Sequence, residues 1–471
     1  MVLIGDVQTM AVVAVVQLIT NITEALAQIY HPKRDIYMYR LSKFVRITKN
    51  SNRLVLYNYR TGGLYWEYID SSRYNELTNI ITGNINENSK LLSLLLSKGF
   101  LIHESDDEYS ILQTQYSNYK AYEIDSTIRL TIFVNEMCNF KCVYCYEENN
   151  GGEIEYCTLE GVICFLDSLI DETTKCIVIS WFGGEPLLSV SKIVEFMKNI
   201  QLKFNNLIIQ SSITTNGFLL DSKVHSLLQS ACVNEYQITV DSFEHDMFRK
   251  TRSGELSLNR IIENIRAILS SYKPSQIHLR INLNPVIYGR IYEFLDFVKT
   301  FANQYLTIHF HPIADMGGDI VPSLICDQDF FVNTLPDLNK YCQENNLNTA
   351  IMHDMLCPFS GTCYAGNSKS FVIDRLGLIR KCTVDYNGVE NIVGYIKDSN
   401  AIRFSQESND LWCENYSLKN PICKDCEKLP VCYGAGCPLK AIKGQFSCNK
   451  NATVEETIIL QASYQYSLSG E

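Results

Sequence analysis

The stretch that decides the fold is Cys138-Asn-Phe-Lys-Cys142-Val-Tyr-Cys145, directly after the alternating run Leu130–Asn135. Its three thiols stand four and three residues apart on one short segment. Iron–sulfur clusters take cysteine ligands, so three thiolates can hold three irons of a [4Fe–4S] cluster. No fourth cysteine lies nearby, which leaves one iron open to an outside ligand. A zinc site or three chance cysteines are the alternatives, but a structural zinc site needs a fourth ligand.

The composition is that of an ordinary globular protein. The chain has 471 residues, 46% apolar and 20% charged, and a net charge of −11, which suggests about three domains of roughly 150 residues. The acidic balance argues against a nucleic-acid partner, because phosphate binding needs clustered Lys and Arg. The apolar stretch Met10–Ile19 is too short to span a membrane and follows Asp6, not a basic segment. We therefore expect a cytoplasmic protein without a membrane partner.

The cysteines are concentrated in the later part of the chain. All 18 lie at or after position 138, and nine of them fall within Cys357–Cys448. Clustered cysteines in a long chain that is not secreted indicate metal binding and not a disulfide scaffold.

The first part of the chain predicts a small domain. Residues 1–42 form a helical extension, with one helix at Met10–Ile29, and residues 43–104 form a winged helix-turn-helix. The elements expected in this domain are strands at 44–48, 54–59, 64–68 and 100–103 and helices at 72–81 and 86–96. The polar residues 105–126 predict a linker.

Strands and helices alternate over residues 127–320. Strands are expected at 130–135, 176–182, 207–214, 235–241, 276–284 and 305–311, with helices near 158–170, 189–204, 221–230, 256–272 and 288–303. Six such repeats predict an α/β fold, a partial (β/α)6 barrel whose chemistry lies at the carboxyl ends of its strands. Residues 321–356 form a bridging region, 357–450 a cysteine-rich domain and 451–471 a C-terminal helix or tail.

The cluster motif, with Tyr144 before its third cysteine, resembles the signature of the radical SAM enzymes. A second resemblance is Gly183-Gly184-Glu185-Pro186, at the end of the second strand. It implies that the backbone and Glu185 receive the amino group of S-adenosylmethionine, since glycines permit close approach and Glu185 supplies the opposite charge. An ordinary turn is the alternative for this tetrapeptide.

Further elements of the family follow on later strands. The resemblance implies that Asn216, in Thr214–Gly217, shapes the cofactor site and that Thr239, on the fourth strand, contacts the cofactor. It also implies that Arg249 pairs with the cofactor carboxylate, as a guanidinium can do through two parallel hydrogen bonds. An exposed helix position is the alternative for Arg249.

The C-terminal cysteines resemble a SPASM domain, which binds two auxiliary [4Fe–4S] clusters. The resemblance gives one set of ligands as Cys357, Cys363, Cys382 and Cys437 and the other as Cys423, Cys426, Cys432 and Cys448. The gap between Cys432 and Cys437 is one residue longer than the family pattern, which puts Cys437 in question. A zinc ribbon is the alternative for the C-x₂-C block.

Together these resemblances imply a maturase of ribosomally made peptides with S-adenosylmethionine and three [4Fe–4S] clusters. The N-terminal domain would bind the leader of a precursor peptide, and a flavodoxin or ferredoxin would supply electrons. The expected product is a crosslink, a Cys thioether; epimerisation and a carbon–carbon crosslink are the alternative products. A sulfatase-maturating enzyme is an alternative, although Thr383 stands where that family has Asp. A non-catalytic iron–sulfur or zinc protein is the other alternative function.

Overall fold

The structure is a computed structural model that describes residues 39–85, 88–147, 151–314, 322–385, 388–414, 421–433, 437–445, 448 and 451–469. The helix expected at Met10–Ile29 lies outside the described residues.

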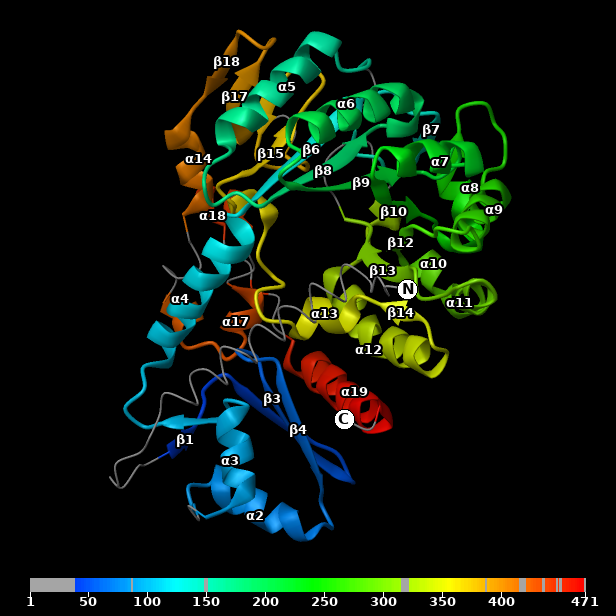
Figure 1. The fold of residues 1–471 in the computed structure, drawn as a ribbon. Helices are drawn as coiled ribbons and strands as arrows, with labels where there is room; N and C mark the ends of the chain where they lie inside the picture. Colours follow the sequence, from blue (N-terminus) through cyan, green and yellow to red (C-terminus); the bar gives the residue numbers. More distant parts are fainter. Residues whose placement is uncertain are drawn as a thin grey trace.

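The N-terminal unit is a small sheet covered by two helices (Figure 1). Strands β2 (Val45–Lys49), β3 (Arg53–Asn58) and β4 (Gly63–Tyr68) form an antiparallel sheet, and β1 (Tyr39–Leu41) pairs with β5 (Leu101–His103). Helices α2 (Ser72–Ile81) and α3 (Lys90–Ser97) begin at the N-cap residues Ser71 and Ser89, whose hydroxyls accept backbone N–H groups. The expected order of three strands, two helices and a closing strand is therefore present.

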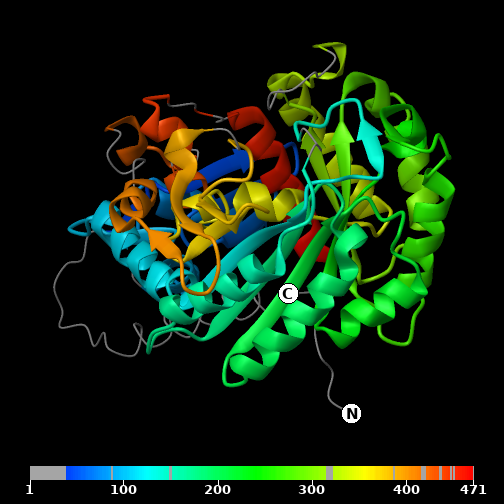
Figure 2. The ribbon, with the colours of Figure 1, turned by 90° about the horizontal axis from the view of Figure 1, so that it is seen from above.

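The predicted barrel is confirmed as six adjacent parallel strands. Their order in the sheet follows the chain: β6 (Thr127–Asn135), β8 (Cys176–Gly183), β9 (Ile208–Thr215), β10 (Val233–Thr239), β12 (Gln276–Leu283) and β13 (Leu306–Pro312). The helices that connect them are α5 (Tyr156–Leu169), α6 (Val190–Lys203), α7 (Ser222–Ser230), α8 (His245–Phe248), α9 (Leu258–Leu269), α10 (Pro285–Tyr288) and α11 (Ile291–Lys299). These helices lie along the outer side of the curved sheet (Figure 2).

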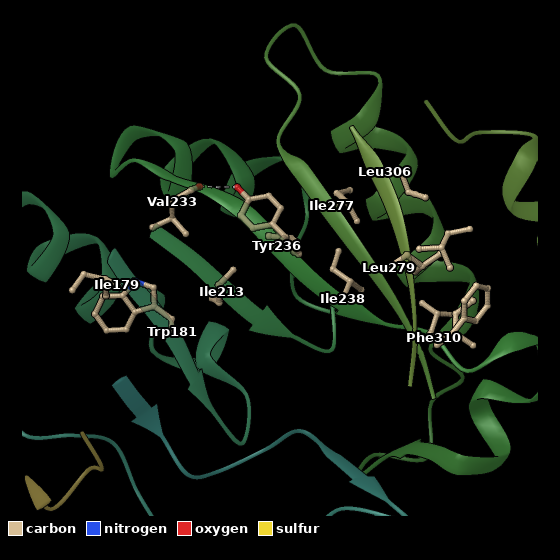
Figure 3. Packing of buried hydrophobic residues seen from close by; sticks show 14 of the residues in the cluster. Ile179, Trp181, Ile213, Val233, Tyr236, Ile238, Ile277, Leu279, Leu306 and Phe310 are labelled. Atoms are coloured by element: carbon tan, nitrogen blue, oxygen red, sulfur yellow. Dashed lines mark hydrogen bonds between the residues drawn. The ribbon is translucent and has the colours of Figure 1, made fainter. Parts of the chain in front are cut away.

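The two faces of these strands differ in chemistry. Apolar side chains on one face, such as Trp181, Ile238 and Leu279, are fully buried in the main core (Figure 3). Most of the alternate positions are polar and point into the barrel, because successive side chains of a strand face opposite sides. Apolar exceptions on β6 and β8 are Phe133, Val178 and Phe182. The polar positions near the strand ends are therefore the ones that can form a site.

The same sheet continues into the C-terminal part of the chain. At one edge β15 (Ser370–Ile373) pairs in parallel with β6, and β16 (Leu378–Arg380), β17 (Ile392–Ile396) and β18 (Ile402–Phe404) follow antiparallel. At the other edge β14 (Asn348–Thr349) pairs with β13, next to α12 (Gln328–Glu344) and α13 (Ile351–Leu356). The short helices of the cysteine-rich part are α14 (Gln406–Cys413), α16 (Pro421–Lys424), α17 (Leu429–Cys432) and α18 (Pro438–Ile442).

Residues 105–126, for which the composition predicts a linker, are largely helical. They form α4 (Glu108–Tyr119), continued by one π-helical segment, Lys120–Ile124. Tyr116 of α4 stacks on Tyr433 with ring centroids 4.1 Å apart. The segment is therefore packed against the cysteine-rich part.

The C-terminal helix α19 (Ala452–Ser469) lies beside the N-terminal sheet (Figure 1). It covers the face of β2–β4 opposite α2 and α3, so β3 is buried on both sides. Within the described residues, no helix combines the length and the apolar character that crossing a membrane requires.

Candidate functional site

The three cysteines of the cluster motif lie on the loop that follows β6. Within this loop β7 (Phe140–Cys142) pairs antiparallel with β11 (Arg249–Thr251), so that Cys142 stands opposite Arg249. Two further backbone contacts join the segments, from Val143 N to Phe248 O (2.9 Å) and from Arg252 N to Asn139 O (2.8 Å). The pairing brings Arg249 beside the cysteine loop from more than 100 residues away in the chain.

Gly183 and Gly184 lie against the backbone at the start of the same loop. A Cβ on Gly183, whose φ is +107°, would meet Asn135 O, and a Cβ on Gly184 would lie 2.7 Å from Glu136 O. Glu185 N also donates to Met137 O at 2.8 Å. Only residues without a side chain permit this contact between the ends of β6 and β8.

The Glu185 carboxylate is fully buried at the ends of β8 and β9. Its Oε1 accepts from Thr215 Oγ1 (2.6 Å) and Leu187 N (3.0 Å), and its Oε2 accepts from Asn216 N (2.8 Å). Burial raises the pKa of Glu185 although these bonds oppose the shift. A carboxylate has about four acceptor positions, so Oε2 keeps capacity for one further donor.

Tyr144 is the centre of a buried polar network. Its hydroxyl contacts the carboxylate of Asp241 and receives hydrogen bonds from Arg249 Nη1 (3.2 Å) and Asn282 Nδ2 (3.1 Å). Burial opposes the charge of Arg249, but Cys142, Tyr144 and Asp241 raise its pKa well above the ordinary value. The alternative of an exposed helix position for Arg249 is wrong, because the residue is 9% exposed and lies on β11.

The remaining predicted cofactor residues lie at the ends of neighbouring strands. Asn216 Nδ2 donates to Asn139 Oδ1 at 2.7 Å, beside Cys138. Thr239 is buried at the end of β10, opposite Arg280 on β12. The structure thus brings all the predicted cofactor residues to one end of the barrel, next to the cysteine loop.

Sequence reasoning missed two residues of this site. Arg252 Nε donates to Cys138 O at 2.8 Å, and Thr215 donates to Glu185. The only signal in the sequence for Arg252 and Thr215 was that each lies close in the chain to a predicted site residue. Neither residue belongs to a motif that indicates which group it would contact.

The donor set fits an iron–sulfur cluster with one open iron. Burial raises the pKa of Cys138 to about 12 and that of Cys142 to about 11, and electrostatic interactions link Cys138 with Cys142 and Cys142 with Cys145. The three thiols are therefore close together in a buried place, where deprotonation needs a metal. No group of three or more metal-binding side chains among the described residues is already spaced for a single ion.

The charged side chains of the site also fit S-adenosylmethionine, whose amino acid end carries an ammonium and a carboxylate. Arg249 Nε is buried and has no hydrogen-bond partner among the described residues. Glu185 and Arg249 thus offer the two opposite charges that such a group requires.

One set of C-terminal cysteines surrounds Cys423. The pKa of Cys423 is raised by burial and then by electrostatic interaction with Cys426, Cys432 and Cys448. The other three residues predicted for the second auxiliary cluster therefore lie within electrostatic range of Cys423.

The other set is gathered in part. The pKa of Cys363 is raised to about 11, first by burial and also by Cys382 and Cys437, so these three thiols are neighbours. Cys437 lies with this set in spite of its irregular spacing. Cys357 instead interacts with His353, whose pKa is raised to about 10 chiefly by Asp354 and then by Cys357.

The barrel interior also contains a row of histidines. His278 Nδ1 and His309 Nε2 are 2.9 Å apart, and Glu235 Oε1 lies 2.9 Å from His278 Nε2. Burial lowers the pKa of His309 to about 4 and that of His311 to about 3, the latter with a contribution from Arg280. The imidazoles of His309 and His311 are therefore neutral at physiological pH.

Comparison with known proteins identifies the barrel. Residues 132–298 match the family model described as the Radical SAM superfamily. The chain is 23% identical over 448 residues to a "Radical SAM cyclopropyl synthase TigE" from Paramaledivibacter caminithermalis, covering 84% of this chain and 88% of that protein. It is 27% identical over 191 residues to a "Probable GTP 3',8-cyclase" from Methanococcus aeolicus, covering 39% of this chain and 60% of that protein.

A solved structure shares the fold. It is "Native anSMEcpe with bound AdoMet and Kp18Cys peptide", with a TM-score of 0.56 and 18% identity over 72% of this chain and 98% of that chain. Residues 132–298 therefore form a radical SAM domain, and the protein is an enzyme of the oxidoreductase type.

Proposed function

We propose that this radical SAM enzyme modifies a ribosomally made precursor peptide and closes a crosslink in it, a Cys thioether. The observation that carries the proposal is that the chain gathers three separate groups of cysteines, one in the barrel and two in the C-terminal part. Auxiliary clusters beside the barrel suit a reaction that must dispose of an electron after the first hydrogen is removed.

The cofactor would be held by residues at the carboxyl ends of the strands. Cys138, Cys142 and Cys145 would ligate the first cluster, Glu185 would accept the ammonium of S-adenosylmethionine and Arg249 would bind its carboxylate. Gly183, Gly184, Asn216, Thr239 and Tyr144 would shape the cavity around it. When bound, the cluster and S-adenosylmethionine supply a 5′-deoxyadenosyl radical that takes a hydrogen atom from the substrate.

The C-terminal cysteines would hold two auxiliary clusters in a SPASM-type domain. Cys423, Cys426, Cys432 and Cys448 would ligate one, and Cys363, Cys382, Cys437 and Cys357 the other. Cys357 is the ligand with least support, since its interaction is with His353. The proximity of the other seven thiols within their two sets supports this division.

The N-terminal unit would bind the leader of the precursor. Strand β4 pairs only with β3 among the described strands, so its other edge can accept an extended peptide as a fourth strand. Tyr65, Trp66 and Tyr68 lie on this strand and offer aromatic surface to a leader side chain.

A carbon–carbon ring is the second candidate product. It is favoured by the similarity to the cyclopropyl synthase, which extends over 84% of this chain. Formylglycine formation has less support, because Thr383 follows Cys382 and its hydroxyl contacts Tyr364 Oη at 3.0 Å, with no carboxylate in that position.

Coexpression with a precursor encoded by a neighbouring short reading frame tests the proposal. The expected result is a peptide that loses two hydrogen atoms per bond and one alkylatable thiol per thioether. A ring between carbons also loses two hydrogen atoms but keeps every thiol. Formylglycine formation from Cys replaces sulfur by oxygen and loses two hydrogen atoms as well. A precursor that coelutes with cluster-replete enzyme but stays unmodified would contradict peptide modification.

A further inference from the structure

Lys381 is a buried cation without a carboxylate partner. It follows β16 directly, precedes Cys382 in the chain and is 0% exposed. Its Nζ donates to Asn367 O (2.7 Å) and Asn409 Oδ1 (2.8 Å) and lies 4.6 Å from the centre of the Phe371 ring. All three partners are neutral.

Two other lysines with little exposure, one buried and one half-buried, are paired with carboxylates. Lys192 lies 3.0 Å from Glu153 Oε2, and Lys428 lies 2.6 Å from Glu455 Oε1. No carboxylate within the described ranges lies at ion-pair distance from Lys381. An uncompensated buried ammonium is strongly unfavourable, so its opposite charge is expected close by.

The groups beside Lys381 that can carry negative charge are thiols. Lys381 interacts electrostatically with Cys413 and Cys363, and Cys363 in turn interacts with Cys382 and Cys437. Asn391 ties the backbone of the two adjacent positions together, because its Oδ1 accepts from Lys381 N (2.9 Å) and Cys382 N (2.8 Å). The Lys381 backbone is therefore fixed beside that of Cys382, and its ammonium lies within electrostatic range of Cys413 and Cys363.

We propose that Lys381 is the counter-charge of the iron–sulfur cluster held by Cys363, Cys382 and Cys437 and that it raises the reduction potential of that cluster. A [4Fe–4S] cluster with thiolate ligands is an anion that gains one more negative charge on reduction, so a fixed cation stabilises the reduced form. Lys381 is a positioning residue and does not ligate iron. The inference rests on the proposed function only in assigning a cluster to these three cysteines.

The test is an anaerobic redox titration followed by electron paramagnetic resonance, in a Cys138→Ala/Cys142→Ala/Cys145→Ala background that leaves the C-terminal clusters. Lys381→Met is expected to lower the equilibrium constant for reduction of one cluster at least tenfold, which is about 59 mV for one electron. Lys381→Arg keeps the charge and is expected to keep most of the potential. Lys192→Met is the matched control and is expected to leave both potentials unchanged.

A second variant covers the case in which Lys381→Met fails to assemble its cluster. Asn409→Asp puts a carboxylate against the same ammonium with almost no change of shape, so it is expected to lower the same potential. Cys413→Ser is expected to have no effect.

Unchanged potentials in Lys381→Met and Asn409→Asp, with full iron content, would overturn the inference. A higher potential in Cys413→Ser would also overturn it, because the loss of that thiolate would then free the ammonium and identify Cys413 as the partner of Lys381. A parent protein with no cluster at Cys363, Cys382 and Cys437 would instead contradict the proposed function.

Discussion

Glu185 accepts three hydrogen bonds from its own chain and keeps one acceptor position for an outside donor. We expect Glu185→Gln to weaken binding of S-adenosylmethionine by about 10- to 100-fold, since a hydrogen bond to a charged group contributes about 1.5–3 kcal/mol. Isothermal titration of the anaerobic holoenzyme measures this. Thr215→Val removes one donor without changing the charge and should have a smaller effect. Equal affinity in Glu185→Gln and the parent would assign Glu185 a purely structural role.

The histidine row gives a prediction on protonation. His309 and His311 should remain neutral in the folded protein until the pH falls toward their pKa values of about 4 and 3, whereas an unfolded histidine protonates near pH 6.5. Their contribution to stability is therefore present above pH 6.5 and is lost as the pH falls toward 4.

Replacing Arg280 tests the cause of this shift. Arg280→Met removes a nearby positive charge and should raise the pKa of His311, as measured by hydrogen–deuterium exchange at the imidazole carbon. His225 is the internal control, because its pKa is lowered by burial without an arginine. An unaltered pKa for His311 would show that Arg280 does not contribute to the shift.

At the scale of elements, the contact between the ends of β6 and β8 positions the cysteine loop. Gly184→Ala would place a Cβ 2.7 Å from Glu136 O, so we expect the loop to shift and about four iron atoms per chain to be lost. Gly152→Ala is the control, since a Cβ there meets nothing within 4 Å. Full iron content in Gly184→Ala would contradict this role.

The barrel elements were predictable because apolar and polar residues alternate with a clear period of two. The helix α4 was not, because its composition is polar and its packing face consists of spaced residues such as Tyr109, Leu112 and Tyr116. The β7–β11 pair was missed for another reason. Each strand has three residues, and the pairing depends on a contact between segments far apart in the chain.

At the scale of the whole molecule, α19 joins the N-terminal sheet to the second group of C-terminal cysteines. Glu455 on α19 is 0% exposed and accepts from Lys428 Nζ (2.6 Å) and Tyr59 Oη (3.1 Å). Lys428 lies between Cys426 and Cys432, and Tyr59 follows β3. The N-terminal sheet, proposed to bind the leader, and the second group of C-terminal cysteines, proposed to bind a cluster, are thus connected through the buried ion pair of Glu455 and Lys428.

Glu455→Gln should loosen both parts together, because breaking a buried ion pair costs about 3–5 kcal/mol. Amide exchange is expected to accelerate in residues 45–58 and 421–433. Glu456→Gln is the matched control, since Glu456 is 39% exposed in its pair with Arg46 and such surface pairs contribute about 0–1 kcal/mol. Faster exchange in only one of the two segments would show that they are not linked through Glu455.

The sequence motifs named the residues that gather at the barrel end, because each motif follows a predicted strand and parallel strands end at one edge. They could not show that β15 extends the sheet beyond β6 or that α19 covers the N-terminal sheet, since neither contact has a local pattern. The position of Lys381 beside Cys363 was equally hidden, as it depends on how β15 and β16 fold back.

The central claim is that three thiolates leave one iron free to bind and cleave S-adenosylmethionine. The most direct measurement is the yield of 5′-deoxyadenosine after anaerobically reconstituted enzyme is mixed with S-adenosylmethionine and dithionite. We predict 5′-deoxyadenosine from the parent enzyme and none from Cys142→Ala, which should still hold its C-terminal clusters. Cluster-replete parent enzyme that releases no 5′-deoxyadenosine would contradict the claim.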